Sequence, residues 1–164
     1  GVKEKDLISF LPEMLRQFES AGERPVVRFF AGKEGVTTVR EEALNLKKKE
    51  THVIFSYGHL SKIYSEKELD DYSARRKSLG IHSRAMYVHQ AYFEKAGLDK
   101  LTERRFLPLE AVSIDIWVFD DKVAIYSLQG NPFALVIQSV QIASSVKMIF
   151  EFLWTHAEGP KDSQ

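Results

Sequence analysis

One stretch, from Val112 to Ser139, constrains the fold more than any other part of the chain. It contains three runs of β-branched and aromatic residues, Val112–Phe119, Lys122–Leu128 and Phe133–Ile137, separated by turns rich in Asp, Gly, Asn and Pro. Such runs and turns are typical of half-buried strands in an antiparallel meander. In the first run one side is wholly aliphatic and the other is mixed, which predicts that one side faces a core.

The remaining pattern predicts an α/β domain in which a layered sheet is flanked by helices. Strands are expected at Val26–Phe30, Thr51–Tyr57 and Ile81–His89, and helices at about Val36–Lys48 and at Glu66–Ser78 and Val140–His156. Gln90–Lys100 is interpreted as a short helix or loop, and Thr102–Phe106 as a polar link. The expected organisation is one domain over residues 21–157, an amphipathic helix in 1–20 and a disordered tail over 158–164.

Composition excludes several classes of protein. The 164 residues carry no net charge, which argues against a large basic surface for nucleic acid or an anionic membrane. The absence of Cys removes disulfides and thiolate chemistry and fits a reducing compartment. No apolar run reaches the roughly 20 residues that span a bilayer, and Gly1–Lys5 does not start a signal peptide, so a cytoplasmic location is predicted.

No residue pattern in the sequence predicts a catalytic centre. None of the five His has a partner at zinc-hydrolase spacing, and no G-x-S-x-G is present, so no metal, cofactor or catalytic residue is predicted. The Gly-rich turn Ala31–Gly35 is either an anion site at a helix start or a plain turn. Asp120 and Asp121 fit a turn role, whereas Asp115 either lines a cleft or is solvated.

Three segments, in their order and spacing, resemble the C-terminal domain of TrmB-like transcriptional regulators. They are Arg24–Gly35, with its Pro, alternating strand, two aromatic residues and G-K-E-G; Arg75–Ile81, an R-x-K-x-x-G-I run; and the meander with the closing helix through Trp154. The resemblance covers about Leu11 to Trp154. It implies a fold similar to phospholipase D in a non-catalytic, effector-sensing and dimerising domain. It also implies that DNA is bound by a winged helix-turn-helix missing from this chain, with residues 1–20 as the end of a linker or dimerisation helix.

The resemblance also carries the prediction that the domain is not an enzyme. Active phospholipase D enzymes need H-x-K followed by Asp, in which His attacks phosphorus and Lys stabilises the developing charge. Aligning Asp120 with that Asp places Ser113 and Asp115 at the His and Lys positions. Aligning Asp121 instead places Ile114 and Ile116 there. Neither alignment supplies a nucleophile or a cation.

A ligand cleft in this fold is expected at the carboxyl ends of the strands. The residues predicted to line it are Gly32, Lys33, Ser56, Tyr57, His89 and Asp115. Two alternatives remain open at this stage. One is a phosphodiesterase or nuclease with displaced catalytic groups drawn from His52, His59, His82 or His89 across a dimer interface. The other is a stand-alone dimerisation adaptor that binds another protein.

Overall fold

The computed structural model describes residues 24–56, 60–96, 99–109 and 112–160, together with Ser9, 11–13 and Gly22. Ser9 and 11–13 are helical, so the predicted helix in 1–20 lies largely outside the described residues. Tyr57, His59 and 161–164 also lie outside them. None of the described helices has both the length and the apolar character needed to cross a membrane.

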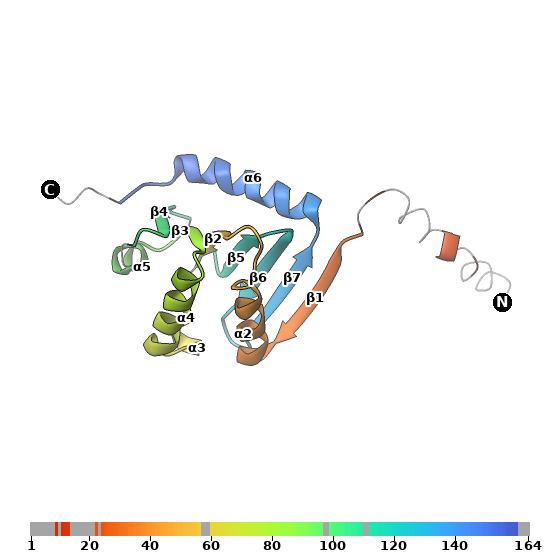
Figure 1. Cartoon of the computed structure of the whole chain (residues 1–164), viewed down its shortest axis with the longest axis horizontal. Coiled ribbons are helices and arrows are strands. Elements are labelled where there is room, and N and C mark those ends of the chain that lie inside the picture. Colours follow the sequence, from red (N-terminus) through yellow and green to blue (C-terminus); the bar gives the residue numbers. More distant parts are fainter. Residues whose placement is uncertain are drawn as a thin grey trace.

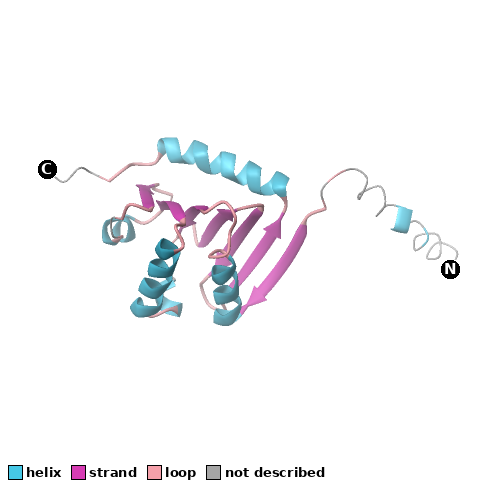
Figure 2. Ribbon diagram, viewed as in Figure 1, coloured by secondary structure: helices cyan, strands magenta, loops and turns pink. Residues whose placement is uncertain are grey.

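The described chain is built on a seven-stranded mixed sheet (Figures 1 and 2). In spatial order its strands are β1 (Val26–Ala31), β7 (Phe133–Gln138), β6 (Lys122–Ser127), β5 (Ile114–Phe119), β2 (Glu50–Phe55), β3 (His82–Tyr87) and β4 (Thr102–Phe106). The pairs β2–β3 and β3–β4 are parallel, and every other pair is antiparallel. The predicted meander is confirmed as β5, β6 and β7.

Helices cover both faces of this sheet. Helix α6 (Val140–His156) crosses one face, while α2 (Gly32–Glu42) and α4 (Glu66–Ser78) lie against the other (Figure 1). Two shorter helices, α3 (Leu60–Ile63) and α5 (Gln90–Lys95), follow β2 and β3. The main core packs residues such as Val36 and Val39 of α2 against Trp117 and Tyr126 of the sheet.

Strand β5 corrects the prediction that one side of the first meander run faces a core. Asp115, Trp117 and Phe119 point to the α2–α4 face and are almost fully buried. Ile116 and Val118, on the opposite side of the strand, pack in the cluster under α6. The strand is central and covered on both faces, so its mixed side is as buried as its aliphatic side.

Helix α4 begins and ends at the predicted residues because its first turn is capped. Ser65 Oγ accepts a hydrogen bond from the Glu68 backbone N–H at 3.3 Å, and Glu68 Oε2 accepts one from the Ser65 N–H at 2.7 Å. This reciprocal arrangement satisfies two backbone donors that the helix leaves unpaired. Helix α6 also has its predicted bounds, with Ser139 Oγ accepting from the Ile142 N–H at 3.1 Å.

We expect Ser65→Ala to lower the free energy of unfolding by about 1 kcal/mol, because the cap is lost while no core contact changes. Ser73→Ala, inside the same helix, is the matched control and should be neutral or slightly stabilising, since Ala has the higher helix propensity. Urea unfolding of both variants measures the difference. Equal stability of the two variants would contradict the capping role.

Helix α2 corrects a predicted boundary. It runs over Gly32–Glu42, not Val36–Lys48, so the glycines that suggested a turn lie inside the helix. Gly32 adopts φ +72°, which glycine tolerates without strain. A Cβ on Gly35 would lie 2.6 Å from the carbonyl carbon of Phe30, so the missing side chain allows the helix to approach β1 closely.

Two segments near the far edge of the sheet also differ from prediction. Thr102–Phe106 is strand β4, not a polar link, because its backbone pairs with β3 at the edge of the sheet. Glu158 belongs to the ordered domain and not to a disordered tail. Its N–H donates to the Phe106 carbonyl at 2.8 Å and its carbonyl accepts from the Phe106 N–H at 2.7 Å.

Candidate functional site

All seven strands have one end at the same edge of the sheet, which we call the carboxyl edge. Strands β1, β2, β3, β4 and β6 end there, while β5 and β7 begin there. The described residues of the predicted ligand site that lie at this edge are Gly32, Lys33, Ser56, His89 and Asp115. The edge is wide, however, and hydrogen bonds join only one pair among these five, Ser56 with Asp115.

The Ser56–Asp115 pair is part of the interior. Asp115 Oδ1 accepts hydrogen bonds from both the backbone N–H and the Oγ of Ser56, each at 2.8 Å. The sequence predicted that Asp115 either lines a cleft or is solvated. Asp115 is 1% exposed, so both of these predictions are wrong. Burial raises the pKa of the Asp115 carboxyl to about 6, although the Ser56 hydrogen bonds and Arg40 favour its charged form.

Arg40 lies near this pair and was not singled out from the sequence. Its guanidinium is surrounded by aromatic rings, with centroids at 4.1 Å for Tyr72, 5.0 Å for Tyr64 and 5.6 Å for Trp117. The residue is 6% exposed and sits on the inward stripe of α2 beside Val36. Three aromatic rings can therefore stabilise its charge, and the buried Asp115 carboxyl lies close enough to be favoured by it.

Two buried polar atoms in the same cluster have no hydrogen-bond partner among the described residues. They are Nε1 of Trp117 and Oη of Tyr126, whose rings lie 5.2 Å apart. Burial raises the pKa of Tyr126 well above its ordinary value, so this hydroxyl stays protonated. Two hydrogen-bonding groups, a cation and a carboxyl therefore lie in one buried cluster behind the carboxyl edge. Native interiors rarely leave such groups unpaired.

Tyr126→Phe tests whether the hydroxyl is unpaired in solution. Removing an unsatisfied buried hydroxyl relieves its desolvation penalty, so we expect the free energy of unfolding to stay level or rise by about 1 kcal/mol. Guanidinium unfolding of the two proteins measures this. A loss of about 1 kcal/mol or more would show that the hydroxyl has a hydrogen-bond partner, such as a buried water molecule.

The glycine-rich turn is engaged by the protein itself. The Gly32 N–H donates to the Pro132 carbonyl at 2.7 Å. The Lys33 Nζ pairs with Glu68 Oε1 at 2.8 Å and lies 5.0 Å from the centre of the Tyr64 ring. These contacts favour the plain helix start over the anion site, because the first N–H and the nearby cation both have partners.

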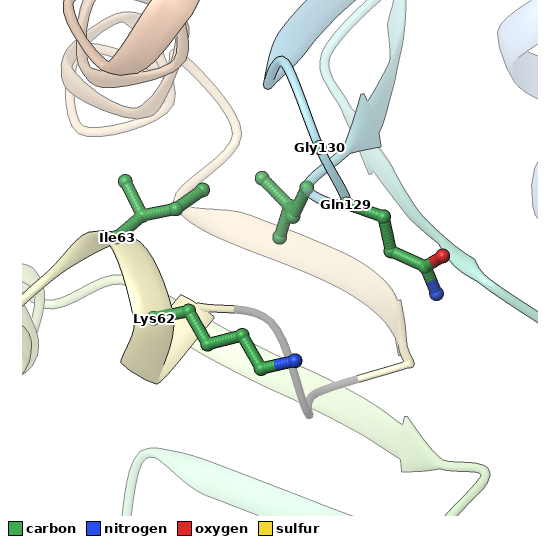
Figure 3. Close-up of a pocket in the computed structure, with 5 residues that line it drawn as sticks. Lys62, Ile63, Gln129 and Gly130 are labelled. Carbon is green, nitrogen blue, oxygen red and sulfur yellow. The ribbon is translucent and has the colours of Figure 1, made fainter.

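A surface pocket of about 340 Å³ opens at the carboxyl edge between α3 and the β6–β7 turn (Figure 3). Lys62 and Ile63 lie on the α3 side, and Gln129 and Gly130 lie opposite on the turn (Figure 3). Leu128, which is buried, completes the lining. None of the five predicted residues that the structure describes lines this pocket. There was little indication of this pocket in the sequence, because Gln129–Pro132 predicted only a turn.

Two of the described histidines, His52 and His82, are diagonal neighbours on one face of the paired strands β2 and β3, whereas His89 lies apart from them. His82 begins β3 and His89 follows its end, so they are separated by about 20 Å of extended chain. His52 is buried on the α6 face, and burial lowers its pKa although Glu50 opposes that shift. The His89 ring contacts Tyr92. Within the described residues no group of three or more His, Asp or Glu could hold a metal ion.

Comparison with solved structures identifies the fold. The archaeal chromatin protein TrmBL2, whose structure shows a novel mode of DNA binding, matches with a TM-score of 0.57 at 16% identity over 97% of this chain and 63% of that chain. NucT from Helicobacter pylori matches with a TM-score of 0.61 at 12% identity over 84% of this chain and 100% of that chain. Nuc from Salmonella typhimurium, a phospholipase D family member, matches with a TM-score of 0.58 at 12% identity over 85% and 100%.

At these identities the likeness establishes the fold alone. The predicted phospholipase D-like α/β fold is confirmed, and the fold is shared with a TrmB-like protein, as the sequence resemblance indicated. The chain spans less than two thirds of the TrmBL2 chain that it matches. No protein-family model matches the sequence, and no curated protein matches it at the sequence level.

Proposed function

We propose that this chain is a non-catalytic, effector-sensing and dimerising domain of a TrmB-like transcriptional regulator. The observation that carries the proposal is the state of Asp115. In the alignment on Asp120, Asp115 stands where phospholipase D enzymes require the lysine that stabilises the phosphoryl oxygens. Here that position holds a carboxyl group, buried and bonded to Ser56, which repels such oxygens whenever it is charged.

The histidine side of the motif supports the same proposal. The sequence contains no His two residues before a Lys, and the aligned His position holds Ser113. The alternative of a phosphodiesterase with displaced histidines needs groups that converge, yet His89 follows the opposite end of β3 from His82, and His52 is buried beneath α6. A second copy would have to complete any such site.

The pocket beside Lys62 and Gln129 is the proposed effector site. It offers a cation, an amide and a backbone turn around the apolar Leu128, which suits a small molecule with hydrogen-bond acceptors and an apolar part. Leu128 follows the end of β6, and both Leu128 and Tyr126 belong to the main core, so a bound effector would contact a residue of the core that holds the buried polar cluster. Through this contact, ligand binding can change the packing of the domain core.

DNA is proposed to be bound only by a winged helix-turn-helix missing from this chain. The balanced charge of the sequence supports this, because a domain that grips DNA by itself usually carries a basic surface. An effector would then act by favouring one geometry of the dimer and so the spacing of the DNA-binding parts. In a stand-alone adaptor, by contrast, the same domain would bind a protein and no small molecule.

Thermal unfolding in the presence of small molecules tests the effector site. The probes are a panel of monosaccharides, sugar phosphates, amino acids and nucleotides. Each is used at a concentration of about 100 times the Kd of a micromolar ligand, at which binding adds about 2.7 kcal/mol to the free energy of unfolding. We expect at least one probe class to raise the unfolding midpoint of the wild type. Gln129→Trp, which fills the pocket, should abolish that rise.

Lys67→Glu is the matched control, because Lys67 is exposed on α4 and does not line the pocket. It should leave the ligand response unchanged, whereas Lys62→Glu should weaken it for anionic probes. A response that survives Gln129→Trp would move the effector site elsewhere. No response from any probe class would favour the adaptor.

A further inference from the structure

The two outer strands of the sheet differ in how their free edges are protected. Strand β4 carries Glu103, Arg104 and Arg105 and is bridged at Phe106 by Glu158. Among the described residues β1 pairs with β7 and with no other strand. An open edge strand presents a row of backbone donors and acceptors that another strand can pair with. Strand β1 is therefore the edge at which the sheet can be extended.

The backbone groups that point outward from β1 can be identified. The Gly32 N–H donates to the Pro132 carbonyl at 2.7 Å, directly beyond the register pair Ala31–Phe133. In an antiparallel pair, residues alternate between those bonded to the neighbour and those facing away. The even-numbered residues of β1 are therefore bonded to β7. The N–H and C=O groups of Val27, Phe29 and Ala31 face the open edge.

The same outward-facing residues carry exposed apolar side chains. Arg28 and Phe30 point to the α2 face, where Arg28 Nη2 donates to Glu42 Oε1 at 2.8 Å and Phe30 packs against the main core. Val27 and Phe29 thus point to the α6 face, where they are 58% and 64% exposed. Arg28 is the one charged residue of the strand and is already paired, so β1 lacks the unpaired charge or Pro that usually guards an edge.

We propose that β1 pairs antiparallel with β1 of a second copy of this chain, so that one sheet runs through both subunits. The proposal rests on the dimerising function proposed above and names the surface that performs it. A two-fold axis requires the same patch on both copies, and an antiparallel pair of identical strands meets that condition. Contact between the apolar side chains of the two copies removes Val27 and Phe29 from water.

Two observations fix the register at Phe29 opposite Phe29 of the second copy. In this register Val27 lies opposite Ala31, so all outward N–H and C=O groups of both strands find partners. A register with Arg28 opposite Arg28 of the second copy would place Ala31 opposite Pro25, which has no N–H. It would also place two like charges directly opposite each other, which is unfavourable. Centring on Phe29 places Arg28 opposite Phe30 of the second copy, where a cation can lie against an aromatic ring.

Cysteine cross-linking tests the pairing directly, because the sequence contains no Cys. Phe29→Cys should form a covalent dimer on mild oxidation, since opposed Cα atoms in such a pair lie about 5.5 Å apart, within disulfide range. Val27→Cys should not form one alone, but the double variant Val27→Cys/Ala31→Cys should. Met148→Cys, 69% exposed on α6, is the matched control and should stay uncoupled.

Sedimentation of the uncoupled proteins separates this inference from the proposed function. We expect the wild type and Met148→Lys to be dimers, and Phe29→Lys to be a folded protein whose dimer dissociates at least about tenfold more readily. A dimer that cross-links through Met148→Cys and not through Phe29→Cys would overturn the β1 pairing and leave the dimerising function standing. A monomeric wild type would overturn both.

Discussion

Replacing Asp115 with Asn is expected to stabilise the domain by about 1–3 kcal/mol at neutral pH. The carboxyl group has an ordinary pKa of 3.8, raised by burial to about 6 in the folded chain, and that gap corresponds to about 3 kcal/mol of destabilisation once the group is charged. An amide has nearly the same shape and can keep both hydrogen bonds from Ser56. The gain is smaller than the full gap because the amide N–H groups also need acceptors.

The pH dependence of this gain has a definite sign. Because the folded pKa of Asp115 is raised, its carboxyl contributes most favourably below about pH 4, and that contribution is lost as the pH rises through about 6. The stability difference between Asp115→Asn and wild type should therefore be small at pH 4 and reach its plateau above pH 7. Urea unfolding across that range measures it.

Asp121→Asn is the control with the opposite sign. Hydrogen bonding from Gln138 lowers the pKa of Asp121, so its carboxylate is favourable near neutral pH and loses that contribution as the pH falls. The side chain is about a third exposed, so the effect should be slight. If Asp115→Asn destabilised the domain at every pH, the carboxyl group would be serving as a needed charge, contrary to this account.

Gly35→Ala is expected to destabilise the domain by about 3 kcal/mol, although the same change in an ordinary helix stabilises it. The new Cβ would lie 2.6 Å from the carbonyl carbon of Phe30 and 2.9 Å from its Cβ, and backbone atoms cannot move aside as a flexible side chain can. Helix α2 must then shift away from β1, which disturbs the Val36 and Val39 packing in the main core.

Thermal unfolding of Gly35→Ala alongside Thr38→Ala measures this effect. Thr38 is exposed on the same helix, so its replacement should be neutral or slightly stabilising. A Gly35→Ala protein as stable as the wild type would mean that α2 and β1 are not held at the distance observed.

The elements that were predicted correctly are those whose determinants are local. Helix α4 carries its capping box and α6 its serine cap, and the meander carries its turn residues. The incorrect predictions concern segments whose secondary structure depends on a contact with a distant part of the chain. Gly35 is a residue typical of turns, but it lies in helix α2, where the strand β1 packs closely against it. Thr102–Phe106 is polar, but it forms a strand because its backbone pairs with β3.

The candidate site was harder to predict than the fold, for a physical reason. The sequence indicated which strand ends share one edge of the sheet, yet among the five described residues predicted there hydrogen bonds join only Ser56 and Asp115. The aromatic rings around Arg40 come from Tyr64 just after α3, from α4 and from β5, so no spacing in the sequence indicates them. An arginine on the apolar stripe of α2, between Val36 and Ala43, was the one signal available.

Hydrolysis of a generic phosphodiester such as bis(p-nitrophenyl) phosphate is the most direct test of the central claim, that a phospholipase D-like fold here serves without catalysis. We expect the purified wild type, His82→Ala and His89→Ala to release product at the rate of the buffer blank between about pH 5 and 8. Turnover by the wild type that either histidine variant removes would contradict the account and establish an enzyme with displaced catalytic groups.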